Sequence, residues 1–447
     1  MTSGPIWKNL ILFAIPILLG DLFQQFYNMA DSIIVGRFVG KTAFAAIGST
    51  VNVTNIAIGL FTGLGLGATA VIARWFGAED EKRFRQSIYT AVIMAIALGA
   101  VLTVGGIVIT PSLLRMMDTP TDVFREAEVY LKIYFGGMVG LVCYNILSSI
   151  LRAAGDSKRP LYLLVFCCLS NIALDILFVY VFKWGIAGAG IATILAEFAS
   201  AGVLFYILSQ KKEICCIPWK TGKFSTKTLM EMVRIGIPVA IQKTIISFSN
   251  VFAISYINYF GTDVLAGWSA YSKIEPLSFA PIQSMSFATT TFVSQNFGQY
   301  NFERMKKGVR DSLIIAFIVA VLTAGFCIGL AKPLVSLFCN EAEVIRYGAM
   351  FIRINMPFLI LCCLNQIFAG ALRAVGYSRD PMIINIGTHV VIRQIFLYII
   401  SITVNDLRFI SFAFPNSWIL NSTATTVYYF VKMKKFYAEH EKRVQIN

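Results

Sequence analysis

Four polar residues with oxygen-bearing side chains interrupt apolar stretches of this 447-residue chain. Asn171 and Asp175 are four residues apart, so they share one face of a helix, and Thr193 lies in the next apolar stretch. If the chain turns near Trp184, Asp175 and Thr193 are each nine residues from the turn. At 1.5 Å per residue both then lie about 13 Å from it, so an antiparallel helix pair puts them at one depth. Asp31, in an earlier stretch, is the fourth residue.

These residue types favour the binding of a small cation. Two carboxylates, an amide and a hydroxyl are hard oxygen ligands that suit Na⁺, and the carboxylates could instead share a proton. The predicted cation or proton site, and the Na⁺ site if sodium is the ion, therefore comprises Asp31, Asn171, Asp175 and Thr193. The alternative is hydrogen bonding between packed helices, which we favour for Asn171 and Thr193 taken alone. For the two aspartates we favour the ion site, since a carboxylate in hydrocarbon costs at least ~2.5 kcal/mol.

Further polar residues in the apolar stretches are candidates for lining a substrate cavity, with simple packing or pairing as the alternative. Asp21, Gln24, Asn28 and Asp31 are spaced to form one polar stripe along a helix. Glu275 has pairing with Lys243 or Lys273 as its alternative. The full set of cavity candidates is Asp21, Gln24, Asn28, Glu197, Lys243, Glu275 and Arg393.

The composition indicates an integral membrane protein made of helices. Hydrophobic residues make up 57% of the chain and charged residues 14%, and the mean hydropathy is +0.70. Twelve apolar stretches are each long enough to cross about 30 Å of hydrocarbon. They are expected at 10–36, 44–72, 88–110, 130–151, 160–182, 186–209, 233–259, 264–292, 311–331, 349–372, 381–402 and 409–431.

The net charge of +14 indicates membrane orientation rather than nucleic-acid binding, because lysine and arginine collect in alternate connections. By the positive-inside rule both termini are cytoplasmic, with some attraction to anionic lipid. The basic connections are 74–85, 152–159, 211–227, 304–310, 373–379 and 432–443.

Known metal and catalytic motifs are absent from the sequence. The nine cysteines include no CxxC pair, and the two histidines form no HExxH motif. We therefore expect no disulfide framework, no cofactor besides a coupling ion, and no enzyme activity.

The sequence contains an internal duplication. LRAAGDSKRP at 151–160 returns as LRAVGYSRDP at 372–381, and the same shift of 221 residues carries RWFGAEDEKRF onto QNFGQYNFERM. Each copy holds six spans, so the copies are parallel repeats, as in alternating-access transporters. We expect an N-terminal six-helix lobe at 1–209, a cytoplasmic linker at 210–230 and a C-terminal lobe at 231–447. Pro16 and Pro238 start the first span of each copy and suggest a shared kink.

The second copy does not repeat the acidic residues. The shift places phenylalanine opposite Asp31, Asp175 and Thr193: Phe252, Phe396 and Phe414. An alternative register aligns DILFVY with RQIFLY and puts Arg393 opposite Asp175. Neither register supplies a carboxylate, so the ion site is expected in the N-terminal lobe only.

Several motifs together resemble the MATE family, multidrug and toxic compound extrusion, in its DinF-like bacterial branch. They are PILLGDLFQQFYNMADSIIVGRFVG, ATAVIARWFGAEDEKRFRQ, LRAAGDSKRP, NIALDILF with GIAGAGIAT, and ATTTFVSQNFGQ. The resemblance implies a twelve-helix fold of two lobes that exports organic compounds in exchange for Na⁺ or H⁺. It also places the four predicted ligands on positions matching a cation-site motif of that branch.

The sequence thus predicts an antiporter for organic, cationic or amphipathic compounds in the cytoplasmic membrane. It would work as a monomer with small molecules and lipid, and not nucleic acid, as its partners. The alternative is a flippase for lipid-linked or anionic amphipathic substrates, favoured by Lys243, Lys273 and Arg393 and disfavoured by the acidic site and by twelve rather than fourteen spans.

Overall fold

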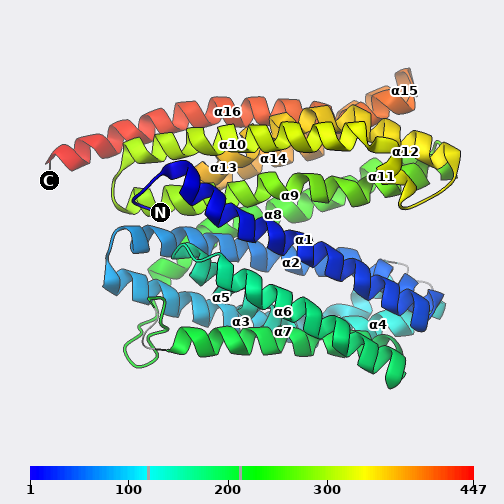
Figure 1. Cartoon of the computed structure of the whole chain (residues 1–447), viewed down its shortest axis with the longest axis horizontal. Helices are drawn as coiled ribbons and strands as arrows, with labels where there is room; N and C mark the ends of the chain where they lie inside the picture. Colours follow the sequence, from blue (N-terminus) through cyan, green and yellow to red (C-terminus); the bar gives the residue numbers. More distant parts are fainter. Residues whose placement is uncertain (118–120, 211–213, 447) are drawn as a thin grey trace. The chain divides into compact units, whose positions relative to one another are not determined.

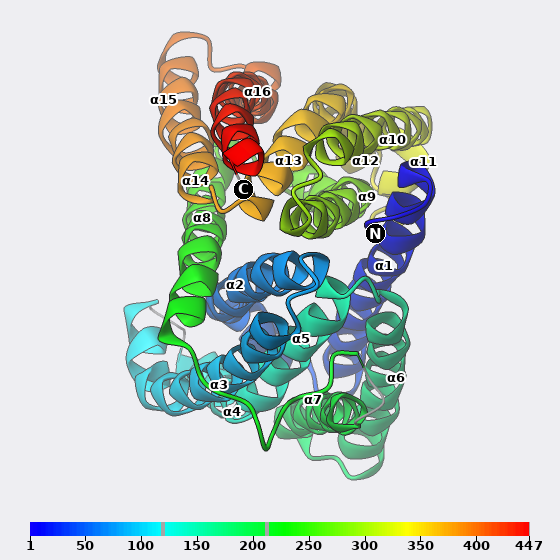
Figure 2. The same ribbon diagram turned by 90° about the vertical axis from the view of Figure 1, so that its left-hand side faces the viewer.

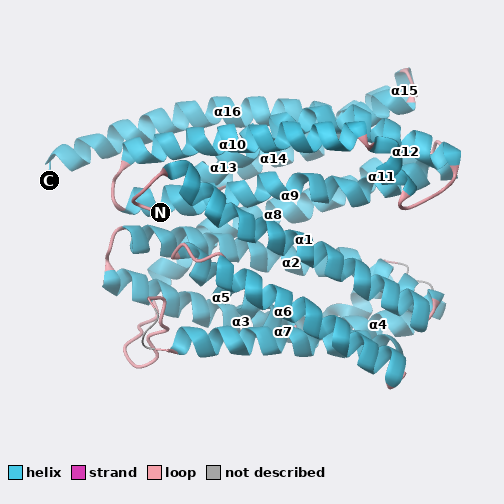
Figure 3. Ribbon diagram, viewed as in Figure 1, coloured by secondary structure: helices cyan, strands magenta, loops and turns pink. Residues whose placement is uncertain are grey.

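The computed structural model describes residues 1–117, 121–210 and 214–446. Within those ranges every regular element is a helix (Figure 3). The helices of the first copy, labelled in Figure 1, are α1 Ile6–Phe38, α2 Lys41–Gly77, α3 Glu81–Met116, α4 Thr121–Gly136, α5 Met138–Ala153, α6 Lys158–Asp175, η1 Ile176–Val181 and α7 Gly185–Ser209.

The second copy repeats this order. Its helices are α8 Thr226–Asn258, α9 Thr262–Gly298, α10 Phe302–Gly329, α11 Ala331–Ser336, α12 Ala342–Asn355, η2 Met356–Phe358, α13 Leu359–Ala374, α14 Arg379–Ile386, η3 Gly387–Ile392, α15 Arg393–Thr403 and α16 Leu407–Ile446. The start and end of α2 recur in α9 at a distance of 221 residues. The duplication in the sequence is therefore a duplication of helices.

All twelve predicted spans fall on helix. In the described part of the chain, nine helices are long and apolar enough to cross a membrane, and α4 with α5, bent by 46° at their junction, would make a tenth. The two spans outside that set are α9 and α16, which are 37 and 40 residues long. The predicted all-helical membrane fold is confirmed.

Local sequence sets the same helix start in both copies. Asp80 precedes α3 and accepts a hydrogen bond from the backbone N–H of Arg83 at 3.0 Å. Its repeat counterpart Asn301 precedes α10 and accepts one from the N–H of Arg304 at 3.1 Å. Both residues satisfy a backbone donor that the first helical turn leaves without a partner.

Contacts divide the chain into two compact units. Unit 1 comprises Met1–Leu18 with Ile241–Asn447, and unit 2 comprises Leu19–Ala240. The boundaries lie within α1 and α8, so each of these helices contributes to both units. Units defined by contact and lobes defined by the repeat are different divisions of the chain, and the predicted lobe boundaries stay a prediction.

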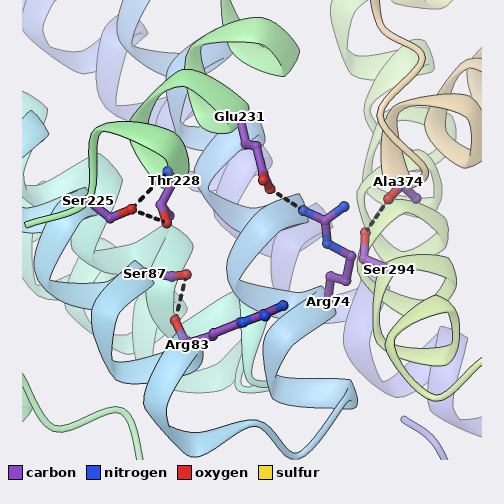
Figure 4. A network of polar contacts seen from close by, with 8 residues as sticks. All are labelled: Arg74, Arg83, Ser87, Ser225, Thr228, Glu231, Ser294 and Ala374. Atoms are coloured by element: carbon purple, nitrogen blue, oxygen red, sulfur yellow. Dashed lines mark hydrogen bonds and ion pairs between the residues drawn. The ribbon is translucent and has the colours of Figure 1, made fainter.

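In unit 2 the first half of α8 packs tightly on α2, and the residue before α8 is hydrogen-bonded to α3. Gly67 allows the approach, because a Cβ there would lie 2.2 Å from the carbonyl oxygen of Met232. Arg74 of α2 forms an ion pair with Glu231 of α8 (Figure 4). The N–H of Ser225, just before α8, donates to Thr90 Oγ1 of α3 at 3.2 Å. Polar and steric constraints together fix where α8 begins.

In unit 1 the first half of α1 belongs to the apolar core. Leu10, Phe13, Ala14 and Ile17 are buried in the same cluster as residues of α9, α10 and α13. The guanidinium of Arg304 donates to the carbonyl oxygens of Ser3 and Gly4 at 2.9 Å each. The start of α1 is therefore attached to unit 1 at both its apolar and its polar side.

Each unit has one central helix or helix group. In unit 2, α5 packs against α2, α3 and α7, and α6 packs against α7 (Figure 2). In unit 1, α9 packs against α10, α12 and α13, and α13 packs against α16. The α6 and α7 pair, which carries most of the predicted ligands, is thus supported by α5 from within its own unit.

Candidate functional site

The two predicted carboxylates of unit 2 meet. Asp31 of α1 is 8% exposed, and Asp175, the last residue of α6, is fully buried. Their carboxyl groups lie close enough to share a hydrogen bond when one of them holds a proton. As carboxylates, neither Asp175 oxygen nor Asp31 Oδ1 accepts a hydrogen bond from the residues that the structure describes. The pair therefore has free acceptor positions where a proton or a cation would bind.

The amide and the hydroxyl form a second group. Asn171 Nδ2 of α6 donates to Thr193 Oγ1 of α7 at 3.3 Å, and Thr193 donates to the carbonyl oxygen of Ala189 at 3.1 Å. The hydroxyl of Tyr27 on α1 lies 3.4 Å from Thr193 Oγ1. Asn171 Oδ1 is buried and has no hydrogen-bond partner within the described ranges. Three helices therefore meet at Thr193.

Thr193 forms its hydrogen bond with Asn171, one turn before Asp175, and the helix after Asp175 is not α-helical. Ile176–Val181 form the π-helix η1, which takes more residues per turn than an α-helix. Asp175 consequently lies nearer to the turn than a count of α-helical residues predicts. Gly188 of α7 assists, since a Cβ there would lie 3.1 Å from backbone atoms of Phe178.

The remaining candidates of unit 2 follow α1 and α7. Gln24 and Glu197 line a cavity together with Tyr27, Asn171 and Thr193. The charge of Asp21 faces Arg152 at the end of α5. Asn28 is exposed, and its neighbour Tyr27 contacts Thr193 instead.

The candidates of unit 1 lie on three helices. Arg393, the first residue of α15, is 2% exposed and donates to Ser249 Oγ at 2.9 Å and Asn250 Oδ1 at 2.8 Å. Glu275 of α9 accepts from the hydroxyl of Tyr271 at 3.1 Å, and its charge faces Arg393. Lys243 of α8 is half-buried.

Two tyrosines at the site were not predicted from the sequence. Tyr27 precedes Asp31 by four residues, so helical spacing alone would have placed it on the same face. Tyr130 of α4 is 8% exposed and faces both Asp31 and Asp175. Nothing in the sequence pattern of α4 distinguishes Tyr130 from a packing residue.

The donors present fit a small hard cation. Carboxylate oxygens of Asp31 and Asp175, the free Oδ1 of Asn171 and the Thr193 hydroxyl are all oxygen ligands of the kind that Na⁺ prefers. The same two carboxyl groups suit a shared proton. Buried oxygens without hydrogen-bond partners are expected to hold an ion, a proton or water.

A family model matches this chain twice, over residues 16–177 and 238–399, and its description is MatE. The chain belongs to the MatE family. The two matches coincide with the two copies of the repeat, so the duplication is a property of the family fold. Members of this family are transporters, and this chain is a multi-pass membrane transporter rather than an enzyme.

Curated relatives cover most of the chain. The probable multidrug resistance protein YoeA of Bacillus subtilis is 28% identical over 85% of this chain and 84% of its own length. The probable multidrug resistance protein YpnP of the same organism is 28% identical over 96% of both chains. The multidrug export protein MepA of Staphylococcus aureus is 24% identical over 87% and 86%.

Solved structures share the fold. A MATE protein crystallised with MaL6 superposes with a TM-score of 0.92 at 24% identity, covering 97% of both chains. A MOP superfamily transporter from Pyrococcus furiosus, described as having a binding pocket of reversed polarity, superposes with a TM-score of 0.91 at 25% identity over 96% of both chains.

Proposed function

We propose that this protein is an antiporter that exports organic compounds, cationic or amphipathic, in exchange for the entry of Na⁺ or H⁺. Asp31 and Asp175 bind the coupling ion, and Asn171 and Thr193 support them. The multidrug-resistance names of the B. subtilis and S. aureus relatives support the substrate class.

One observation carries the proposal: two carboxyl groups from different helices meet inside a membrane protein without a basic partner among the described residues. Two carboxyl groups close enough to share a hydrogen bond cannot both stay ionised in a low dielectric without a bound cation. Binding a cation, or holding one proton between them, removes the repulsion. Occupation by the ion therefore changes how strongly α1 and α6 attract each other, which is what coupling requires.

The available energy sets how far such an exchanger can work. A membrane potential of 100 mV contributes about 2.3 kcal/mol per charge, and a tenfold ion gradient about 1.4 kcal/mol. One ion then supports roughly a 500-fold gradient of a neutral substrate, at 1.4 kcal/mol per decade. For a monovalent cationic substrate the electrical part cancels, leaving about tenfold.

In the proposed transport cycle, the binding sites open alternately to the two sides of the membrane. The ion enters from outside, substrate leaves to the outside, and the emptied transporter returns to accept substrate from the cytoplasm. We place the protein in the cytoplasmic membrane with both termini cytoplasmic, on the basis of its basic connections, and we propose that it works as a monomer.

The test uses everted vesicles and a fluorescent cationic dye. Asp175→Asn should abolish dye uptake driven by a Na⁺ or proton gradient, because the amide cannot carry the charge that holds the ion. Asp263→Asn, which changes an exposed aspartate in the first turn of α9, is the matched control. Gradient-driven uptake by Asp175→Asn at the wild-type rate would refute the assignment.

A second candidate function is a flippase for anionic amphipathic substrates. Arg393 favours it, because a buried guanidinium held only by neutral oxygens in the described hydrogen bonds can take an anionic head group. Bleaching of a fluorescent anionic lipid in proteoliposomes by an impermeant reductant would detect flipping, and its absence together with dye export would exclude this function.

A further inference from the structure

A small cavity lies beside the carboxylate pair in unit 2. Its oxygen-bearing lining comes from Gln24 and Tyr27 of α1, Asn171 of α6, and Thr193 and Glu197 of α7. The space open to the centre of a water-sized molecule is about 10 Å³, close to what a single water needs. The cavity therefore has room for one water or one small cation.

Glu197 is an acid that the proposed coupling site does not use. It is half-buried, and its Oε2 atom is enclosed without a hydrogen-bond partner in the described part of the chain. The titratable groups that face it are phenols and thiols from the four surrounding helices: Tyr27, Tyr134, Tyr144, Cys167 and Cys168. Arg152, the basic residue facing Tyr144, donates to the carbonyl oxygen of Ser148.

The uncharged residues that line the cavity add oxygen atoms that can bind a cation. Asn171 is 1% exposed, its Nδ2 is committed to Thr193, and its Oδ1 has no partner among the described residues. The Tyr27 and Thr193 hydroxyls lie 3.4 Å apart. Each hydroxyl oxygen can still direct a lone pair to a cation or water in the cavity. One carboxylate with amide and hydroxyl oxygens is a donor set for a monovalent cation.

Helix spacing joins this cavity to the carboxylate pair. Asn171 lies one turn from Asp175 along α6, and Glu197 lies one turn beyond Thr193 along α7. Each step is about 6 Å at 1.5 Å per residue. On α1, Tyr27 and Gln24 continue the face of Asp31. An ion leaving Asp31 and Asp175 in this direction meets Asn171 and Thr193 first and Glu197 next.

We propose that the cavity is a second binding site for the coupling cation, with Glu197 as its negatively charged ligand. The inference rests on the proposed ion coupling. If the cation is Na⁺, it moves from the aspartates to the cavity oxygens. If it is a proton, the aspartic acid gives it through a cavity water to the Glu197 carboxylate, which becomes the neutral acid as the aspartate becomes charged.

The test compares Glu197→Gln with Glu197→Asp and with Glu126→Gln. Glu126 of α4 is a matched control, since it too is half-buried with an enclosed, unpartnered Oε2 but does not line the cavity. Dye uptake into everted vesicles is measured against Na⁺ concentration at constant pH, and against a pH gradient without Na⁺. These two arms distinguish the ions.

Glu197→Gln should raise the ion concentration for half-maximal transport by about tenfold or more, the loss expected when a charged ligand becomes neutral. Glu197→Asp should recover most of that loss, and Glu126→Gln should match the wild type. If Glu197→Gln matches the wild type in both arms while Asp175→Asn is inactive, the second site is refuted and the coupling site stands. If the wild type shows no gradient-driven uptake, the proposed function itself has failed.

A labelling experiment on the wild-type protein covers the case in which Glu197→Gln does not fold. A hydrophobic carbodiimide reacts with protonated carboxyl groups in apolar surroundings, and peptide mass spectrometry reports the modification of Glu197. If the cation is Na⁺, labelling of Glu197 should decrease as Na⁺ is added. If the cation is a proton, labelling should decrease as the pH rises and Glu197 loses its proton. Labelling that neither Na⁺ nor pH changes would overturn the proposal.

Discussion

Each of the two units has a charged residue next to a π-helix, an acid before η1 in unit 2 and a base after η3 in unit 1. In unit 2, Asp175 immediately precedes the π-helix η1 and meets Asp31 of α1. In unit 1, Arg393 immediately follows the π-helix η3 and donates to Ser249 and Asn250 of α8, the repeat counterpart of α1. Both units therefore join their first helix to a helix with a π-turn, one through acids and one through a base.

The surroundings of the two charges differ in how far they are satisfied. Arg393 has two hydrogen bonds and the ring of Phe414, the repeat counterpart of Thr193, 5.0 Å from its guanidinium carbon, although its Nε has no partner in the described part of the chain. Asp175 accepts no hydrogen bond in the same part of the chain. Arg393 is therefore partly satisfied by its hydrogen bonds, whereas Asp175 has none from the described residues and can bind an ion or a proton.

One asparagine from each unit shows a similar difference. In unit 1, Asn421 Nδ2 donates to Asn385 Oδ1 at 2.7 Å, and Asn421 Oδ1 accepts from Thr425 at 3.0 Å. In unit 2, Asn171 has one hydrogen bond of 3.3 Å and a free Oδ1, within the described ranges. Asn421 therefore serves packing, whereas Asn171 keeps an oxygen available for binding.

The largest effect is expected from removing both acids of unit 2. Asp31→Asn and Asp175→Asn should each lower gradient-driven dye uptake by about 100-fold or more, and the double variant should lose little further activity, because groups that act as one unit are not additive. Uptake assays on the two single variants and the double variant measure this. Two independent, multiplying losses would show that the acids do not share one ion.

A smaller effect on stability would sharpen the comparison of the amides. Asn421→Ala should destabilise the protein by about 1–3 kcal/mol, since it leaves buried partners without a hydrogen bond. Asn171→Ala should cost less, because it breaks a single long hydrogen bond. Thermal unfolding midpoints of the two purified variants in one detergent measure the difference. A larger loss for Asn171→Ala would contradict the division into packing and binding units.

The smallest effect on coupling is expected at Arg393. Arg393→Met should leave gradient-driven export of a cationic dye within about threefold of the wild type, because Arg393 lies outside the coupling site proposed in unit 2. Dye uptake against Na⁺ and against pH measures it. Loss of the ion dependence in Arg393→Met would place part of the coupling machinery in unit 1 and end the asymmetry proposed for the two units.

Much of the architecture could be predicted from the sequence because membrane helices leave a strong signal. Long apolar stretches gave all twelve spans, and the shift of 221 residues gave the duplication. The pairing of Asp31 with Asp175 was predictable in kind, since isolated acids in hydrocarbon need each other or an ion.

Other features depend on geometry that residue types do not encode. The structure has a π-helix at Ile176–Val181 and a hydrogen bond between Asn171 and Thr193, and no residue in ILFVYV indicates a π-helix. Tyr27 and the cavity at Glu197 arise from how three helices meet, which spacing along one helix does not fix. The division of α1 and α8 between units likewise depends on packing partners far away in the sequence.

That division of α1 and α8 has a consequence for the origin of the duplication. Each copy of the repeat keeps the second half of its first helix and gives the first half to the core of the other unit. A single copy made alone would have the first half of its first helix without the core on which that half packs. Its own core would lack the half-helix that the other copy supplies. Two such chains could complete each other only by exchanging these half-helices, as a domain-swapped dimer does. Joining them into one gene would make that exchange permanent within a single molecule.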